Sequence, residues 1–185
     1  FDLDVIDPAH GKWDRTALGF SERGCLVCGR LGKDCASRRA HSAAELQEKT
    51  AAILHGYFAE KDAQWLAGQA ARALLTEVCT TPKPGLVDCA NNGSHRDMDV
   101  FTFLDSTTAL LPYFLRTVRL GQETAALAPE KTFARLRTEG LRAERAMLAA
   151  TRGVNTHKGA VYSMGLACGA AGRLWTDTGF PRDVN

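Results

Sequence analysis

The chain has 185 residues, of which 45% are apolar and 24% are charged. This composition supports a buried core and excludes a disordered tail. Lys and Arg total 23 against 21 for Asp and Glu, which argues against a protein that coats nucleic acid or membrane through bulk charge. We find no apolar run of membrane-spanning length and no secretory signal, so we expect no membrane partner and a cytoplasmic location.

The first seven residues, FDLDVID, alternate apolar and acidic positions, which predicts a short strand. Asp2 and Asp4 would project from one face of this strand and could share a divalent cation such as Mg²⁺. The alternative is an edge strand that exposes its acids to water. Because the chain starts inside this strand without a Met, we expect it to be a fragment of a longer protein.

Three cysteines and a histidine are spaced C-x2-C-x6-C-x5-H, at Cys25, Cys28, Cys35 and His41. Tetrahedral zinc accepts three thiolates and one imidazole as ligands. Without a secretory signal, cysteines are expected as thiols or metal ligands before disulfides. The alternative is a tight turn whose reduced thiols pack under a loop. The spacing alone leaves both interpretations open.

Helical periodicity governs the rest of the chain. The pattern Ser42-Ala-Ala-Glu45 is a capping box that predicts a helix start. The charged step at residues 60–62 then indicates a domain boundary, dividing the chain into residues 1–61 and 62–185. Beyond the first helix, over about 42–60, the apolar spacing predicts a bundle of helices at about 62–79, 98–119, 129–150 and 156–173. We expect Pro112 to kink or divide its helix and the last helix, small or apolar on every side, to be central.

Two acidic residues, Glu77 and Glu144, fall where a helical wheel predicts core. A buried acid needs a cation, a metal or hydrogen-bond donors to offset its desolvation, so both are candidate site residues. The alternatives are a structural ion pair, for example to Arg72 or Arg145, or a helix rotated by one residue.

Three loops are rich in polar groups: TPKPGLVD at 81–88, NNGSHRDMD at 91–99 and GVNTHKG at 153–159. The third opens the last helix, with Asn155 or Thr156 as the expected N-cap and His157 and Lys158 in the first turn. Free N–H groups, the helix dipole and a lysine at one place favour a phosphate. We expect the three loops to meet at one end of the bundle.

Two long segments, TEVCTTPKPGLVDCANNGSHRDMDVFTFLDS and RTEGLRAERAMLAATRGVNTHKGAVYSMGLACGAAG, closely resemble the amino-terminal half of triphosphoribosyl-dephospho-CoA synthases. Residues 1–60, with R-x-C-L-V-C and R-x-H-S-x-x-E-L, resemble the carboxy-terminal part of apo-citrate lyase phosphoribosyl-dephospho-CoA transferases. Some bacteria fuse the two proteins in this order. The resemblance implies a mainly α chain: the end of a small α/β domain with a Cys-rich loop, then a helical bundle.

This resemblance implies a transferase of citrate lyase prosthetic-group synthesis. The synthase moves triphosphoribosyl from ATP to the 2′-hydroxyl of dephospho-CoA and releases adenine. The fused part places phosphoribosyl-dephospho-CoA on the acyl carrier subunit of citrate lyase and releases pyrophosphate. The alternatives are the equivalent synthase of malonate decarboxylase cofactor assembly and a non-catalytic, zinc-stapled module that docks a carrier protein. Because much of both proteins is missing, the activity of this chain alone stays open.

The resemblance also implies the site residues. Breaking the N-glycosidic bond needs one carboxylate to stabilise the sugar cation and another to accept the hydroxyl proton, and the candidates are Glu77, Glu144, Asp88 and Asp97. The triphosphate needs cations and Mg²⁺. The substrate-binding candidates are Lys83, Asn92, His95, Arg137, Asn155, Thr156, His157 and Lys158.

Overall fold

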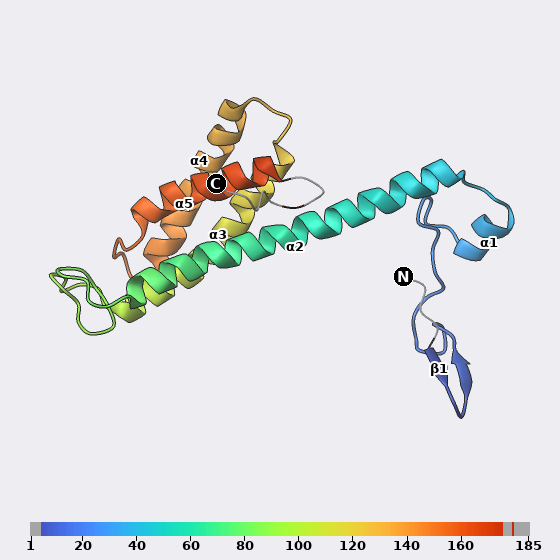
Figure 1. Cartoon of the computed structure of the whole chain (residues 1–185), viewed down its shortest axis with the longest axis horizontal. Helices are drawn as coiled ribbons and strands as arrows, with labels where there is room; N and C mark the ends of the chain where they lie inside the picture. Colours follow the sequence, from blue (N-terminus) through green and yellow to red (C-terminus); the bar gives the residue numbers. More distant parts are fainter. Residues whose placement is uncertain (1–4, 176–178, 180–185) are drawn as a thin grey trace. The chain divides into compact units, whose positions relative to one another are not determined.

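A computed structural model describes residues 5–175 and 179 of the chain, which divides into two compact units, Phe1–Gly56 and Tyr57–Asn185 (Figure 1). The predicted acidic pair, Asp2 and Asp4, lies outside the described residues. The described part is mainly helical, as predicted, with one two-stranded sheet. None of its helices is long and apolar enough to cross a membrane.

The first unit is built from short elements. Strand β1 (Val5–Asp7) pairs antiparallel with β2 (Gly11–Trp13), and the short helix α1 (Gly32–Ser37) follows. Helix α2 (Ala43–Cys79) begins after the predicted capping box: the Glu45 carboxylate accepts the Ser42 backbone N–H at 2.7 Å, and Ser42 Oγ accepts the Glu45 N–H at 3.2 Å. Between residues 5 and 62 the structure describes no buried side chain.

Helix α2 is continuous through the charged step at residues 60–62, so the predicted helix end near residue 60 is wrong. Glu and Lys are good helix formers, and the step contains no Gly or Pro to stop the helix. The acids of the step are used in packing. The Glu60 carboxylate accepts hydrogen bonds from the Arg119 guanidinium, and the Asp62 carboxylate accepts one from Trp175 Nε1 at 2.8 Å.

The second unit adds three helices to the end of α2: α3 (Val100–Glu123), α4 (Pro129–Ala150) and α5 (Lys158–Leu174). They pack pairwise, and α3 contacts both others (Figure 1). The bounds of α4 and the first-turn position of Pro129 are as predicted. Pro112 lies inside α3 without dividing it.

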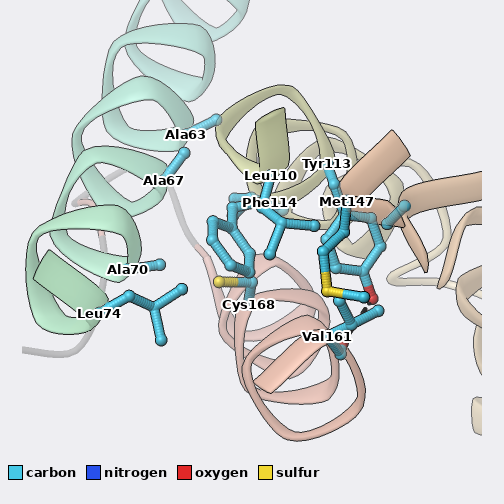
Figure 2. Close-up of a cluster of buried hydrophobic side chains, with 12 residues drawn as sticks. Ala63, Ala67, Ala70, Leu74, Leu110, Tyr113, Phe114, Met147, Val161 and Cys168 are labelled. Carbon is cyan, nitrogen blue, oxygen red and sulfur yellow. Dashed lines mark hydrogen bonds between the residues drawn. The ribbon is translucent and has the colours of Figure 1, made fainter. Parts of the chain in front are cut away.

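The core of this unit lies between the alanine face of α2 and the other helices. Figure 2 shows Ala67 and Ala70 facing Phe114 and Cys168. Small residues on α2 let α3 and α5 approach, and the larger side chains that fill the space are Leu74, Leu110, Tyr113, Phe114, Val118, Met147 and Val161. Two further apolar residues, Leu111 on α3 and Phe133 on α4, lie outside this core and are 42% and 44% exposed, although the helical spacing places them on the apolar faces.

Glycines allow α3 and α5 to touch through their backbones. A Cβ on Gly121 would overlap the carbonyl oxygen of Gly169, and a Cβ on Gly172 would overlap that of Val118. The expectation that α5 is buried on every side is wrong, because Tyr162 on its outer face is 65% exposed. The small residues of α5 therefore serve one close helix contact.

We predict that Gly172→Ala lowers the free energy of unfolding by about 1–3 kcal/mol, because the methyl group must push α5 away from the α3 backbone. Gly68→Ala is the matched control, since this helical glycine has open space around it and alanine should stabilise it by up to about 1 kcal/mol. Chemical denaturation of the two variants measures the difference. Equal stability of both would contradict the close contact.

Candidate functional site

The first polar loop is organised around Asp88. This side chain is 3% exposed, and its carboxylate accepts backbone N–H groups of Lys83 at 3.0 Å, Ala90 at 2.8 Å and Asn91 at 3.0 Å. These donors lower the pKa of Asp88 below its ordinary value because they favour the charged form, and the Asn91 N–H has the largest effect. Asp88 thus holds residues 83–91 in one conformation.

The second loop packs on the first through a pair of glycines. Gly93 has φ +57°, which favours glycine, and a Cβ there would meet the backbone of Gly85 at 2.5 Å. The Ser94 N–H also donates to the Gly85 carbonyl at 3.1 Å. The two loops therefore form one joined structure, which explains why the sequence needs glycine at both positions.

Glu77 lies in the last turn of α2, next to the first of these two loops. Its Oε1 pairs with Lys83 Nζ at 2.9 Å. The prediction that Glu77 faces the core is wrong, because its side chain is 55% exposed and Val78 takes the buried position. The Lys83 side chain is only 14% exposed. The loop thus carries a largely covered ammonium group held by an accessible carboxylate.

Glu144 on α4 makes a similar pair with Lys158, at 2.9 Å between Oε1 and Nζ. The Glu144 side chain is half-buried, 28% exposed, so it lies at the edge of the core and not inside it, where the helical wheel placed it. The partner is not the adjacent arginine but the lysine that opens α5. Both pairs therefore join an acid to a lysine that the sequence had independently assigned to a polar loop.

The third loop is anchored to α3 through Ser106, which is fully buried. Thr156 Oγ1 donates to Ser106 Oγ at 2.7 Å, and Ser106 Oγ lies 2.7 Å from His157 Nδ1. Ser106 Oγ therefore bonds both of the residues that lead into α5. His157 is 6% exposed, and burial lowers its pKa, opposed by the negative charge of Glu77. Burial therefore favours the uncharged form of His157.

The predicted cap of α5 is only partly right. His157, not Asn155 or Thr156, occupies the N-cap position. Asn155 Oδ1 nevertheless accepts the N–H of Lys158, the first residue of the helix, at 3.3 Å. Thr156 is turned toward Ser106 instead.

The three loops lie at the same end of the second unit, as expected (Figure 1). The loop that follows α2 leads directly into α3, and the turn before α5 is bonded to Ser106 near the start of that helix. Glu77 is close enough to His157 to influence its pKa. One end of the bundle thus collects two carboxylates, two lysines and a buried histidine.

The remaining candidates are less closely tied to this group. His95 Nδ1 lies 3.9 Å from the Asp97 carboxylate, which is 64% exposed. Asn92 uses its backbone carbonyl to accept the His95 N–H at 3.0 Å. Arg137 is exposed on α4, and among the described residues it forms no ion pair with the loops.

Ser106 is a site residue that the sequence analysis missed. A serine among apolar residues on a core-facing helix position is a usable signal, because a buried hydroxyl requires a partner. That partner, His157, is 51 residues away along the chain, and nothing local in the sequence indicates the pairing.

In the first unit, the predicted cluster comes together. The ligand atoms of Cys25, Cys28, Cys35 and His41 all lie within 4.8 Å of one another, so the group could hold a metal ion. Backbone N–H groups of Cys28 and Val27 lower the pKa of the Cys25 thiol to about 7. The neighbouring Cys28 thiol, with burial, raises that of Cys35 to about 11.

Comparison with known families identifies two matching segments. Residues 63–183 match the family described as ATP:dephospho-CoA triphosphoribosyl transferase. Residues 1–57 match the family described as apo-citrate lyase phosphoribosyl-dephospho-CoA transferase. No solved structure matches the chain.

Individual relatives cover both segments. A protein named CitXG from Haemophilus influenzae is 43% identical over 94% of this chain, and one from Leuconostoc mesenteroides is 44% identical over 89%. A 2-(5″-triphosphoribosyl)-3′-dephosphocoenzyme-A synthase from Haemophilus ducreyi is 45% identical over 80% of this chain and 45% of its own length. The chain spans 37% of the length of the two CitXG proteins. In those relatives both segments belong to one polypeptide.

We predict that Asp88→Asn lowers the melting temperature by several degrees at pH 7, because the amide loses the charge and turns an N–H₂ toward backbone donors. A lowered folded-state pKa stabilises the fold above the ordinary value of 3.8, and this contribution is lost as pH falls through the folded-state value. The gap between variant and wild type should therefore narrow below about pH 4.

The exposed Asp97→Asn is the control and should melt with the wild type at each pH. A gap for Asp88→Asn that is absent at pH 7, or constant into acid, would contradict the role assigned to Asp88.

Proposed function

The chain belongs to the ATP:dephospho-CoA triphosphoribosyl transferase family, and on that basis we propose that it takes part in moving triphosphoribosyl from ATP to the 2′-hydroxyl of dephospho-CoA, with release of adenine. The observation that carries this proposal is the two lysine–carboxylate pairs, Lys83–Glu77 and Lys158–Glu144, at one end of the bundle. They supply the charges that an anionic donor and a cationic sugar intermediate require.

The lysines are the proposed triphosphate ligands. Hydrogen bonds from ammonium groups to phosphate are charge-assisted and strong. Each lysine is held in place by its carboxylate before substrate arrives. Each pair has one side chain that is more than half exposed, so a phosphate can reach the ammonium group and replace the carboxylate. Mg²⁺ is the proposed counter-ion for the remaining phosphate charge.

The carboxylates are the proposed catalytic groups. Departure of adenine leaves positive charge on the ribose, which a carboxylate stabilises, and the attacking hydroxyl must lose a proton to a base. Glu77 and Glu144 have accessible oxygens, whereas the Asp88 oxygens are occupied by backbone N–H groups. We therefore assign the chemistry to the two glutamates and loop construction to Asp88. From the family resemblance, Asp97 stays a candidate catalytic acid, and His95, Asn92 and Arg137 stay proposed as substrate contacts.

The other segment supports an assignment to citrate lyase. Residues 1–57 match the apo-citrate lyase transferase family, which favours this pathway over malonate decarboxylase cofactor assembly. We propose that the longer protein also transfers phosphoribosyl-dephospho-CoA to the acyl carrier subunit of citrate lyase and releases pyrophosphate. None of the six cysteines forms a disulfide, and we propose that the protein acts in the cytoplasm, where thiols stay reduced.

Zinc is the proposed occupant of the cluster formed by Cys25, Cys28, Cys35 and His41. Thiolates select soft or borderline metals, and three sulfurs with one imidazole make a closed tetrahedral set typical of structural zinc. The Sγ atoms of Cys28 and Cys35 are 3.5 Å apart, close to the tetrahedral edge of about 3.8 Å that follows from zinc–sulfur bonds of about 2.3 Å. The chemistry of this donor set offers no open position for catalysis.

We predict that Glu144→Gln lowers adenine release from ATP and dephospho-CoA by about 10²–10⁴-fold, the usual contribution of a positioned acid or base. Its effect on stability should be small, because the pair with Lys158 is partly exposed. Glu77→Gln should act in the same way. The measurement is adenine release by the full-length protein, alongside thermal melting.

Glu139→Gln is the matched control, since this acid also lies on α4 and pairs with Arg142 at 2.9 Å, but away from the loops. It should release adenine at the wild-type rate. Near-normal turnover in both glutamine variants would remove Glu77 and Glu144 from the chemistry. Absence of any adenine release and of ATP binding in the wild type would favour the non-catalytic carrier-docking module.

A further inference from the structure

The segment that carries the metal cluster has no hydrophobic core of its own. No described side chain from residue 5 to residue 62 is buried. Its apolar residues Leu18, Phe20 and Leu26 are 52%, 57% and 55% exposed. Burial of apolar surface is the main favourable term in folding, so within this unit another interaction must fix the chain.

Local hydrogen bonds shape a turn around the first two thiols. Gly24 and Leu31 form an antiparallel bridge, the Gly29 N–H donates to the Cys25 carbonyl at 2.9 Å, and the Gly32 N–H donates to the Arg23 carbonyl at 2.8 Å. Gly29 has φ +73°, which lets the chain reverse after Cys28. The turn places Cys25 and Cys28 together, but a few solvent-exposed hydrogen bonds do not hold a turn closed.

The return path to His41 is strained as well as short. Helix α1 has six residues and carries Cys35, and isolated helices of this length are unstable in water. Arg39 then takes φ +45°, a conformation that non-glycine residues adopt only where the surroundings over-determine it. That reversal brings His41 back to the thiols.

His41 supplies the observation that points to a ligand. Its Nε2 atom is buried and has no hydrogen-bond partner among the described residues. A buried imidazole nitrogen normally has a partner, and an unpaired one is costly. It belongs to the set whose ligand atoms lie within 4.8 Å of one another. A cation at their centre would satisfy the nitrogen and all three sulfurs at once.

We propose that the metal replaces a hydrophobic core in residues 23–46, so that metal binding and folding of this segment are one equilibrium. This inference rests on the zinc site proposed above. Without metal, the three sulfurs and the imidazole nitrogen lie close together with no cation between them, and the strain at Arg39 is not offset. With metal, four links join the turn, α1 and His41, which lies two residues before α2.

The same links determine where α2 begins. His41 directly precedes Ser42, whose side chain caps the helix together with Glu45. Residues 43–58 of α2 are all exposed, so no packing within the first unit stabilises the first turns of the helix. Fixing His41 on the metal pre-positions the capping box, which reduces the entropy cost of helix nucleation. The metal-free chain should therefore fray at the start of α2.

The test begins with metal content and spectrum. The chain purified without chelator should contain one zinc ion, and replacement by Co²⁺ should give tetrahedral d–d bands with thiolate charge-transfer absorption. Cys35→Ser should weaken the charge-transfer band and the affinity, whereas Cys79→Ser, an exposed cysteine outside the cluster, should change neither. Failure to bind either metal would overturn the zinc site itself.

Hydrogen–deuterium exchange then tests the coupling. In zinc-loaded chain the amides of Cys25, Gly29, Gly32 and Ala40 should be protected, and removal of zinc should accelerate their exchange by about 100-fold or more, together with residues 43–48. Amides of α3 to α5 should not change. Stoichiometric zinc whose removal leaves exchange in residues 23–46 unaltered would overturn the coupling while leaving the zinc site in place.

Discussion

Helix α5 lies against α3 with no side chain between their backbones at Gly121, Gly169 and Gly172. This approach brings the amino-terminal end of α5 next to the first turns of α3, where Ser106 binds Thr156 and His157. A wider spacing would separate these groups and release the third loop. The position of Lys158, and with it the Glu144 pair, thus depends on a contact made at the far end of the same helix.

The electrostatics of the site follow from how each acid is held. Both carboxylate oxygens of Asp88 accept backbone N–H groups, which fixes the first loop. Glu77 and Glu144 are each held by one lysine. Partly exposed ion pairs of this kind contribute little to stability. In the proposed function, the lysines exchange these partners for the phosphates of the bound triphosphate, which frees the carboxylates to act on the sugar. His157 is buried at the start of α5, where it bonds Ser106 and where burial favours its uncharged form.

Much of the fold was predictable because its signals are local. Pro129 and the apolar spacing after it located α4, and the capping box at Ser42 located the start of α2. The side of α2 on which Glu77 lies could not be predicted. The buried side of this helix is made of alanines such as Ala63 and Ala67, whereas the large apolar residue Trp65 is 58% exposed. Helical periodicity in such a sequence does not distinguish inside from outside. The role of Ser106 could not be predicted for another reason, because its partner His157 is 51 residues away along the chain.

The central claim is that Lys83 and Lys158 are pre-positioned for a triphosphate, and calorimetric titration of the full-length protein with MgATP tests it most directly. Lys83→Ala and Lys158→Ala should each weaken binding by about tenfold or more, because each removes a charge-assisted hydrogen bond to phosphate worth about 1.5–3 kcal/mol. Lys131→Ala, an exposed lysine on α4, should bind as the wild type does. Wild-type affinity in both loop variants would contradict the account.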